Sequence, residues 1–317
     1  MGAGLTGYAI RRLFWAVPVL FAVSVIVFYI LRLAPTDPVD AILGKNFYTE
    51  EQAQKLRNKY GYDEPIHIQY LKYMQNLFRG DPGLSIKHQD FSMREVVFDK
   101  MWVSFRLNIV AIVITFGLGI PVGVYAALAR GTFVDPLTIG FWLLIDAIPT
   151  FVMAPLLSWL FALKFGLVSL KYEGLASPNI LLPIIILSLP GVAGVARFMR
   201  ASVLSVVGED YVRTARAKGL KESTVIFTHI TRNALLPMIT VVGLSLPGLA
   251  AGSLFVEQAF GIPGIGRESF QAALTPDYDV VLVIVLFGST LFVLANVLVD
   301  LVYAMIDPRV RLGAARG

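Results

Sequence analysis

The sequence is short of charge for its length. Of its 317 residues only 15% are charged, while 56% are hydrophobic. A soluble protein of average composition carries about 25% charged residues. The missing charge argues against an ordinary soluble domain and indicates that much of the chain lies in a non-aqueous solvent, the lipid bilayer.

Cysteine is absent from the whole sequence. Its absence excludes a disulfide framework and a thiolate metal site. The only histidines, His67, His88 and His229, are scattered along the chain, and their spacing does not indicate a shared metal site. We therefore expect no metal site in this chain.

Signatures of nucleotide binding and hydrolysis are absent as well. The sequence contains no GxxxxGK[ST] P-loop, no HExxH and no GxSxG. Without a P-loop, the chain does not hold ATP phosphates by that route. The net charge of +5 is modest, and the basic residues lie beside apolar segments, as in the cytoplasmic loops of membrane proteins. We expect neither an enzyme nor a nucleic-acid-binding protein.

Long apolar runs are what the sequence has in quantity. A helix needs about 20 apolar residues to cross a hydrocarbon core of about 30 Å. Helices satisfy their backbone polar groups internally, which lipid requires, and the runs are too uniformly apolar for barrel strands. The sequence predicts an all-α integral membrane protein with six transmembrane helices, at about 13–31, 107–128, 136–163, 180–196, 234–256 and 280–299.

Basic residues predict the orientation of these spans. With six spans both termini lie on one side, and short loops rich in Lys and Arg stay in the cytoplasm. The short loops on the side away from the termini hold only Lys164, Lys171 and Arg267. The side of the termini holds Arg11, Arg12, Arg130, Arg197, Arg200, Arg213, Arg216, Lys218, Lys221, Arg232, Arg309, Arg311 and Arg316. We therefore expect both termini in the cytoplasm.

The long segment 34–102, between the first two spans, is expected on the extracytoplasmic side. Thr49 is a suitable N-cap, and the acids that follow it favour the first turn of a helix running on to Tyr60. A second helix is expected over 66–78, before the turn at 80–83. The sequence thus predicts a small helical insertion on the outer face.

The most informative stretch is the loop between the fourth and fifth spans. Glu209 and Asp210 favour a helix N-terminus, where the macrodipole is positive, while Arg216 and Lys218 favour its negative end. Gly219 is well placed just past that end, because glycine adopts positive φ without strain. The pattern predicts a short helix with a sharp stop.

A further helix should run from about Glu222 into the fifth span. The whole loop, 197–233, is expected in the cytoplasm. A short capped helix held between two spans is suited to docking a cytoplasmic partner. A basic loop that only meets anionic lipid headgroups fits the local pattern equally well.

The loop resembles the cytoplasmic signature loop of ABC-importer permeases, often called the EAA loop. The likeness is strongest to the dipeptide, oligopeptide and nickel branch, and it covers nearly the whole chain in order, which makes it specific. The run that carries it is Tyr211-Val212-Arg213-Thr214-Ala215-Arg216-Ala217-Lys218-Gly219-Leu220, continuing through His229, Arg232-Asn233-Ala234-Leu235 and Pro237. The other matching segments are 33–38, 63–65, 69–70, 80–85, 119–123, 148–151, 260–266 and 307–309.

The sequence departs from the pattern of that branch at a few positions. Thr36 replaces a usual glycine, and Pro82 stands where leucine is common. Arg213 holds the place of the glutamate that gives the loop its name, as this branch often allows. The start of the second span, residues 102–108, fits poorly. These departures bear on the substrate or the outer insertion rather than on the family.

The resemblance implies the type I ABC importer permease fold in a bacterial or archaeal inner (plasma) membrane. Such a permease is not catalytic. It works with a second homologous permease, two ATP-binding subunits and an extracytoplasmic substrate-binding protein. ATP and Mg²⁺ bind to the partner ATPases, and this chain binds no cofactor. The substrates of the branch are dipeptides, oligopeptides, nickel complexes, glutathione and some oligosaccharides, and peptides are the default expectation.

The same resemblance implies the residues that couple the chain to the ATPases. A coupling helix docks in a cleft on each ATPase and transmits its closure to the spans. The residues expected to do this here are Glu209, Asp210, Tyr211, Arg213, Thr214, Ala215, Arg216, Ala217, Lys218, Gly219 and Leu220.

Asp146 is the one acid deep within a predicted span. Exposing it to lipid would cost about 2.5–3.5 kcal/mol, so we expect it to face protein or water. It either lines the translocation pathway, together with Pro149 and Phe151, or pairs with a basic or amide partner, in this chain or in the second permease. Glu257 and Arg197 lie at span ends, where we expect them at the membrane interface.

A secondary transporter or channel that works alone is the main alternative. It predicts inverted repeats or charged residues along several spans. The sequence has neither feature clearly, and this alternative leaves the loop signature unexplained. A membrane-embedded enzyme would need a catalytic constellation, which the sequence does not reveal.

Overall fold

The structure is a computed structural model, and it describes residues 5–34, 39, 48–82, 93–250, 252–275 and 277–306. Nearly every element in these ranges is an α-helix and the rest are short 3₁₀ or π turns, which confirms the all-α prediction. The matching segments 35–38, 83–85 and 307–309, and the basic residues of the C-terminal tail, lie outside the described residues.

The chain, predicted as one membrane domain, divides into two compact units. One contains Met1–Ser104, Ala250–Leu254 and Pro263–Gly317, and the other contains Phe105–Leu249 and Phe255–Ile262. The first unit holds α1 (Leu5–Arg32), α3 (Glu50–Tyr60), α4 (Ile66–Phe78), the start of α5 (Met93–Leu128), α14 (Ile265–Leu274) and α15 (Tyr278–Ile306).

The second unit holds the rest of α5 and most of the remaining helices. These are α6 (Val134–Asp146), α7 (Thr150–Ser158), η1 (Trp159–Lys164), η2 (Pro178–Ile180), α8 (Leu181–Val206), α9 (Asp210–Ala217), α10 (Glu222–Thr224), η3 (Val225–Thr231), α11 (Arg232–Ala234), α12 (Leu236–Ser245), η4 (Leu246–Ala250) and α13 (Leu254–Ala259).

Four helices are long and apolar enough to cross a membrane, and up to six spans result if each of two bent pairs counts as one. The four are Ile10–Arg32, Glu95–Leu128, Pro178–Val206 and Tyr278–Leu301. The bent pairs are Val134–Asp146 with Thr150–Lys164, and Glu222–Ala234 with Leu236–Ser245. The count of six therefore stays a prediction.

The run at 136–163 is broken rather than continuous. Its two helices meet at an angle of 84°, and Pro149 is the extended N-cap of α7, with φ −58° and ψ 140°. Proline offers no backbone N–H to a helix, and the residue before it is disfavoured in the α region. The local sequence Ala147-Ile148-Pro149 thus accounts for the break.

Two other runs also differ from their predicted limits. The helix that contains 107–128 begins at Met93, so the end of segment 34–102 is already part of α5. The run at 234–256 is not one helix, because α12 ends at Ser245 and is followed by a 3₁₀ turn before α13 starts at Leu254. In contrast, Pro183 and Pro190 do not interrupt α8.

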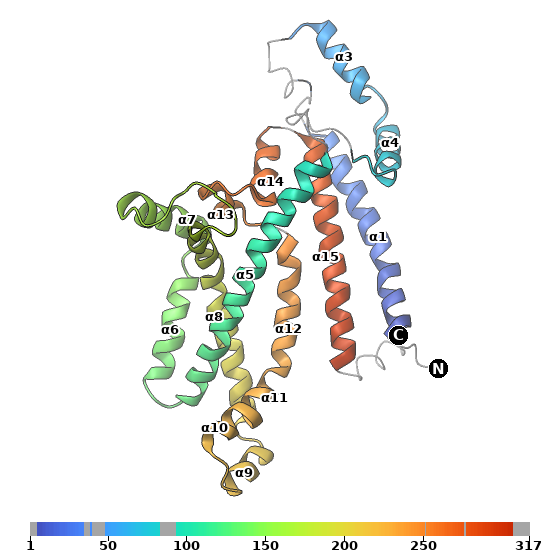
Figure 1. Ribbon diagram of the computed structural model, residues 1–317. Coiled ribbons are helices and arrows are strands. Elements are labelled where there is room, and N and C mark those ends of the chain that lie inside the picture. Colours follow the sequence, from blue (N-terminus) through green and yellow to red (C-terminus); the bar gives the residue numbers. More distant parts are fainter. Residues whose placement is uncertain are drawn as a thin grey trace. The chain divides into compact units, whose positions relative to one another are not determined.

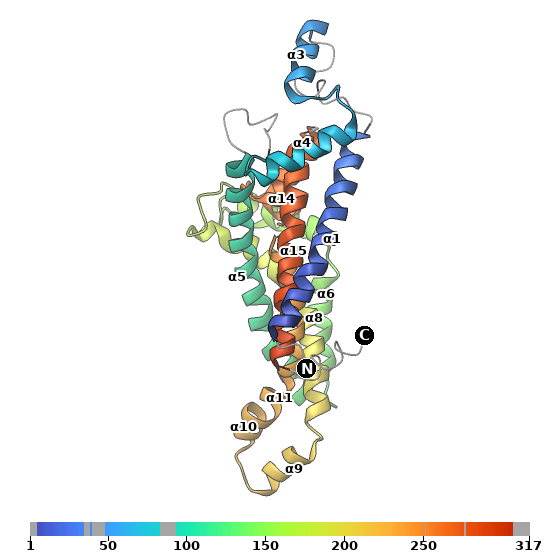
Figure 2. The ribbon, with the colours of Figure 1, turned by 90° about the vertical axis from the view of Figure 1, so that its right-hand side faces the viewer.

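In the first unit, α1 and α15 lie side by side (Figures 1 and 2). Arg12 Nη1 lies 3.0 Å from Asp300 Oδ2, and Arg32 Nη2 lies 3.1 Å from Asp279 Oδ1. Arg12, in the first half of α1, thus pairs with a residue near the end of α15. Arg32, the last residue of α1, pairs with a residue at the start of α15. The two helices are antiparallel, with an ion pair toward each end.

The predicted outer helices are present in this unit with nearly the expected limits. Thr49 caps α3 in a capping box, because its side chain accepts from the Gln52 backbone while the Gln52 side chain accepts from the Thr49 backbone. Figure 2 shows α4 running across the end of α1. Tyr70 of α4 is buried against Phe28, and its hydroxyl lies 2.8 Å from Ser24 Oγ.

In the second unit, glycine lets α5 approach α8 closely. A Cβ at Gly123 would lie 2.5 Å from the carbonyl oxygen of Ala196 and 2.7 Å from the Cβ of Met199. Any side chain there would push the helices apart, and small residues at such contacts are how membrane helices pack without a hydrophobic driving force. The motif around 119–123 is therefore a packing site.

Candidate functional site

The predicted short helix between two long ones is present as α9, which spans Asp210–Ala217. Figures 1 and 2 show it beyond the end of α8, with the chain turning back from it into α10. Its N-cap Glu209 is extended, with φ −68° and ψ 149°, and Asp210 lies in the first turn. Arg216 is in the last turn, so the charges oppose the helix dipole as the sequence predicts.

Gly219 closes α9 in the expected left-handed conformation, with φ 74°. Its N–H donates to the carbonyl of Arg216 at 2.9 Å, and the N–H of Leu220 donates to the carbonyl of Ala215 at 3.4 Å. This pair of bonds is a Schellman motif, which satisfies carbonyls left over at the helix end. The sharp stop therefore depends on the backbone of Gly219.

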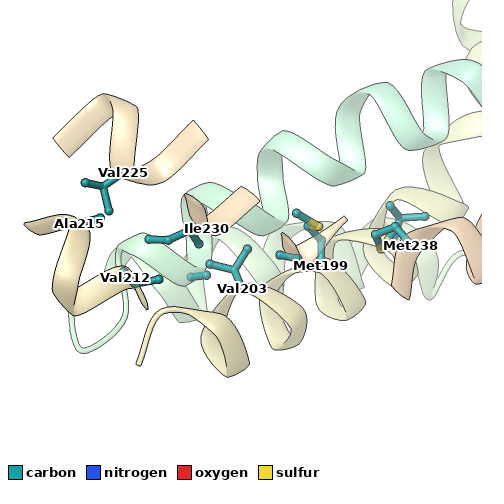
Figure 3. Packing of buried hydrophobic residues seen from close by; sticks show 10 residues of the cluster. Met199, Val203, Val212, Ala215, Val225, Ile230 and Met238 are labelled. Carbon is teal, nitrogen blue, oxygen red and sulfur yellow. The ribbon is translucent and has the colours of Figure 1, made fainter. Parts of the chain in front are cut away.

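One face of α9 is anchored to the rest of its unit. Val212 and Ala215 are 0% and 4% exposed. They belong to one apolar cluster with Val225 and Ile230, and the cluster continues along α8 and α12 (Figure 3). Because residues three apart share a helix face, the Val212/Ala215 spacing fixes which side of α9 points inward.

An ion pair also links α9 to the helix that follows. Arg216 Nη2 donates to Glu222 Oε1 at 2.7 Å, and Arg216 Nε donates to Glu222 Oε2 at 3.3 Å. These two hydrogen bonds favour the charged guanidinium and so raise the pKa of Arg216 above its usual value. The ion pair between Arg216 and Glu222 therefore stabilises the turn between α9 and α10, in addition to the backbone conformation of Gly219.

The other face of α9 is exposed. Tyr211 and Leu220 are each 41% exposed, and Phe227 in the following helix is 71% exposed. The remaining exposed residues of the expected coupling set are Glu209, Asp210, Arg213, Thr214, Arg216, Ala217, Lys218 and Gly219. Ala215, which the resemblance also assigns to the coupling set, instead faces the apolar cluster. The surface combines apolar side chains with cations, which suits contact with another protein.

The second group expected from the sequence gathers at the break between α6 and α7. Asp146 is the last residue of α6, Pro149 caps α7, and Phe151 lies in its first turn. All of these are exposed, and the Phe151 ring lies 5.6 Å from that of Phe255. Among the residues that the structure describes, Asp146 has no hydrogen-bond or ion-pair partner, so the structure gives no support to a pair within this chain.

In the second unit, the burial of two acids was not predicted from the sequence. Asp135, at the start of α6, accepts from Arg200 Nε at 2.6 Å and from Arg200 Nη2 at 2.5 Å, and links α6 to α8. An acid at the first turn of an apolar helix was the available signal. Glu257 was expected at the interface, but it is 0% exposed within α13.

Comparison with known proteins gives matches over almost the whole chain. Residues 119–312 match the family described as binding-protein-dependent transport system inner membrane component, and residues 5–105 match its N-terminal counterpart. The oligopeptide transport system permease protein OppB of Haemophilus influenzae is 37% identical over 305 residues, covering 96% of this chain and 99% of that protein.

A second relative is the oligopeptide transport system permease protein AppB of Bacillus subtilis. It is 33% identical over 318 residues, covering 96% of this chain and 99% of that protein. Among solved structures, an amino acid ABC transporter with histidines has a TM-score of 0.49 and 18% identity, covering 65% of this chain and 92% of that one.

Proposed function

The chain belongs to the family of binding-protein-dependent transport system inner membrane components, and on this premise we propose that it is one permease subunit of an ATP-driven peptide importer. The observation that carries the proposal is full-length similarity to oligopeptide permeases. In this role the chain forms half of a translocation pathway. A second homologous permease forms the other half, two ATPases bind on the cytoplasmic side, and an extracytoplasmic binding protein delivers the peptide.

The exposed face of α9 is the proposed contact with an ATPase. Its inward face packs through Val212 and Ala215 on η3 and on the apolar cluster that continues along α8 and α12, so a force on the outer face is transmitted to those helices rather than absorbed by a loose loop. ATP-driven closure of the ATPases would move α9, and with it the spans, between inward-open and outward-open states. No ATP-binding residue is needed in this chain.

The break between α6 and α7 is the proposed part of the translocation pathway. A carboxylate at a helix break inside an apolar layer is stable only when water or protein faces it. The exposed Asp146, with Pro149 and Phe151 beside it, offers a negative charge and an aromatic surface to a peptide. A pair between Asp146 and the second permease is the competing interpretation.

A co-purification experiment tests the composition of the complex. The chain is tagged, extracted gently from its native host, and the proteins that remain attached are identified. A second permease together with ATP-binding subunits is the expected result. An active oligomer of this chain alone, without an ATPase, would overturn the importer function and favour the lone transporter.

Gly219→Val tests the coupling role of α9. A β-branched residue at φ 74° is strained, so the Schellman turn should be lost while the spans are unaffected. The expected result is a chain that inserts and assembles but transports nothing. Gly219→Asn is the matched control, because asparagine tolerates the left-handed region, and it should retain most of the transport. Normal transport rates in Gly219→Val would rule out the coupling assignment.

A further inference from the structure

A groove between α6 and α8 combines positive charge with an apolar floor. It has a volume of about 470 Å³ and is lined by Asp135, Pro136, Ile139, Gly140, Leu143, Arg197 and Arg200. Pro136, Ile139, Gly140 and Leu143 follow one another at helical spacing, so they form a single face of α6. The neighbouring helices pack against each other, as Figure 1 shows.

The groove lies at one end of the apolar layer. The turn at 129–133 joins α5 to α6, so α6 enters the apolar layer at about Val134, and Asp135 ties this level to Arg200 of α8. Arg197 is one turn earlier on α8, which places it about 4.5 Å deeper at 1.5 Å per residue. The cations therefore lie near one end of the apolar segments of α6 and α8.

The arginines of this groove carry more charge than their single acid neutralises. Arg200 neutralises the charge of Asp135 by donating two hydrogen bonds to its carboxylate. Arg197 is exposed and has no hydrogen-bond or ion-pair partner in the described part of the chain. Arg130, in the α5–α6 turn, is also exposed, and its charge acts on Asp135. The site has a net positive charge and an arginine ready to bind an anion.

Small residues keep the groove open next to Arg197. A Cβ at Gly140 of α6 would have no heavy atom within 4 Å, and the same holds for Gly194 of α8. Gly194 precedes Arg197 by three residues, so it lies on the same face of α8, further into the apolar layer. At both glycines the space that a side chain would fill is therefore open.

We propose that this groove binds an anionic phospholipid, with its phosphate on Arg197 and an acyl chain over Ile139, Gly140 and Leu143. Free phosphate would match the arginine but not the apolar floor, and an uncharged lipid would match the floor but not the arginine. Basic pockets between membrane helices are suited to anionic headgroups. The lipid goes beyond the proposed transport function, and its orientation in the membrane rests on that proposal.

Native mass spectrometry of the whole solubilised complex tests the site by titration with phosphatidylglycerol. The wild-type complex should retain this lipid and not phosphatidylcholine. Arg197→Gln should weaken retention about five-fold, the effect of one arginine at a membrane surface. The matched control Lys171→Gln, which removes a charge from the loop after η1, should retain the lipid as the wild type does.

Gly140→Phe fills the groove and so tests whether a lipid or the second permease occupies it. The expected result is loss of the lipid from a complex that still contains all its subunits. Loss of the second permease instead would mean that the groove is a subunit interface and would overturn the proposal. Unchanged retention in both groove variants, or displacement of the lipid by inorganic phosphate alone, would overturn it too. All these readouts are independent of Gly219→Val, which tests transport.

Discussion

Single residues in this chain end a helix, allow two helices to pack closely, or place a charge on a helix. Gly219 ends α9 because glycine adopts φ 74° without strain. Gly123 admits α8 because it has no side chain. Asp146 and Arg32 show two ways in which the chain carries a charge at the end of an apolar helix. Asp146 is exposed at a helix break, whereas Arg32 pairs with Asp279 and lies over the ring of Tyr62.

Asp146→Asn is predicted to lower peptide transport without dissociating the complex. The amide keeps the size of the side chain but removes the charge that would attract a peptide's amino group. Uptake into reconstituted vesicles measures the loss of transport. Co-purification of the second permease shows whether the complex stays intact. Full transport by the variant would exclude the pathway role. Loss of the partner permease would identify Asp146 as part of an inter-subunit pair.

Asp279→Asn is predicted to destabilise the α1–α15 pair. Arg32 and Asp279 are each 12% exposed in their side chains, and the Arg32 guanidinium lies 4.8 Å from the centre of the Tyr62 ring. Removing one partner of a buried ion pair leaves an uncompensated charge, at a cost of about 3 kcal/mol. The midpoint of thermal unfolding of the solubilised complex should fall.

The exposed ion pair of Lys72 with Glu64 provides the control for this measurement. Its side chains are 58% and 36% exposed, and pairs of that kind contribute about 0–1 kcal/mol. Lys72→Gln should leave the unfolding midpoint nearly unchanged. Equal shifts for the two variants would mean that the Arg32 pair is not a special anchor of α1.

At the scale of elements, α9 is a helix too short to be stable alone. Isolated helices below about 12 residues are marginal in water, and α9 has 8 residues. Its caps define where it begins and ends, while the apolar cluster of Figure 3 holds it in place. The rigid connection to α8 and η3, rather than the helix itself, is what would allow a push on α9 to reach the spans.

Ile230→Ala is predicted to loosen α9 from its support. Ile230 is 0% exposed and belongs to the cluster that contains Val212. Truncating a buried isoleucine to alanine costs about 2–5 kcal/mol, so amide hydrogen exchange across residues 210–217 should become faster. Phe133→Ala is the control, since Phe133 is 80% exposed, lies outside the α9 surface, and its removal should leave exchange there unchanged. Equal protection in both variants would contradict the anchoring role of the cluster.

At the scale of the molecule, the orientation in the membrane is the main prediction still to be tested. The family and the apolar helices make the chain a multi-pass membrane protein, and the distribution of basic residues predicts cytoplasmic termini. More than half of the basic residues on the side of the termini lie in the one loop 197–233, so the predicted orientation depends mainly on that loop. It also decides which end of each unit meets the ATPases and which meets the binding protein.

Labelling of single cysteines can test the orientation against a clean background, because the chain has no cysteine of its own. Thr132→Cys, in the exposed turn between α5 and α6, should react with a membrane-impermeant maleimide only in inside-out vesicles. Lys171→Cys, in the loop after η1, should react in intact cells whose outer layers are permeable to the reagent. The reverse pattern would invert the predicted topology.

The sequence by itself determined the helical class, the apolar runs, the limits of α3, α4 and α9, and the caps of α3 and α9. These features depend on residues close together in the chain, namely the length of an apolar run, a capping side chain or a glycine after a helix. Local chemistry is therefore enough to predict them. The family resemblance was equally readable, because its motifs are contiguous segments.

Only the tertiary structure decided which side of α9 faces inward, how sharply the run at 136–163 bends, and that Asp135 pairs with Arg200. It also placed Glu257 in the interior rather than at the interface. Each of these depends on a neighbour brought close by folding: Val212 on Ile230, and Asp135 on an arginine 65 residues away. Such contacts leave little trace in the local sequence, because the free energy that fixes them comes from packing and pairing across helices.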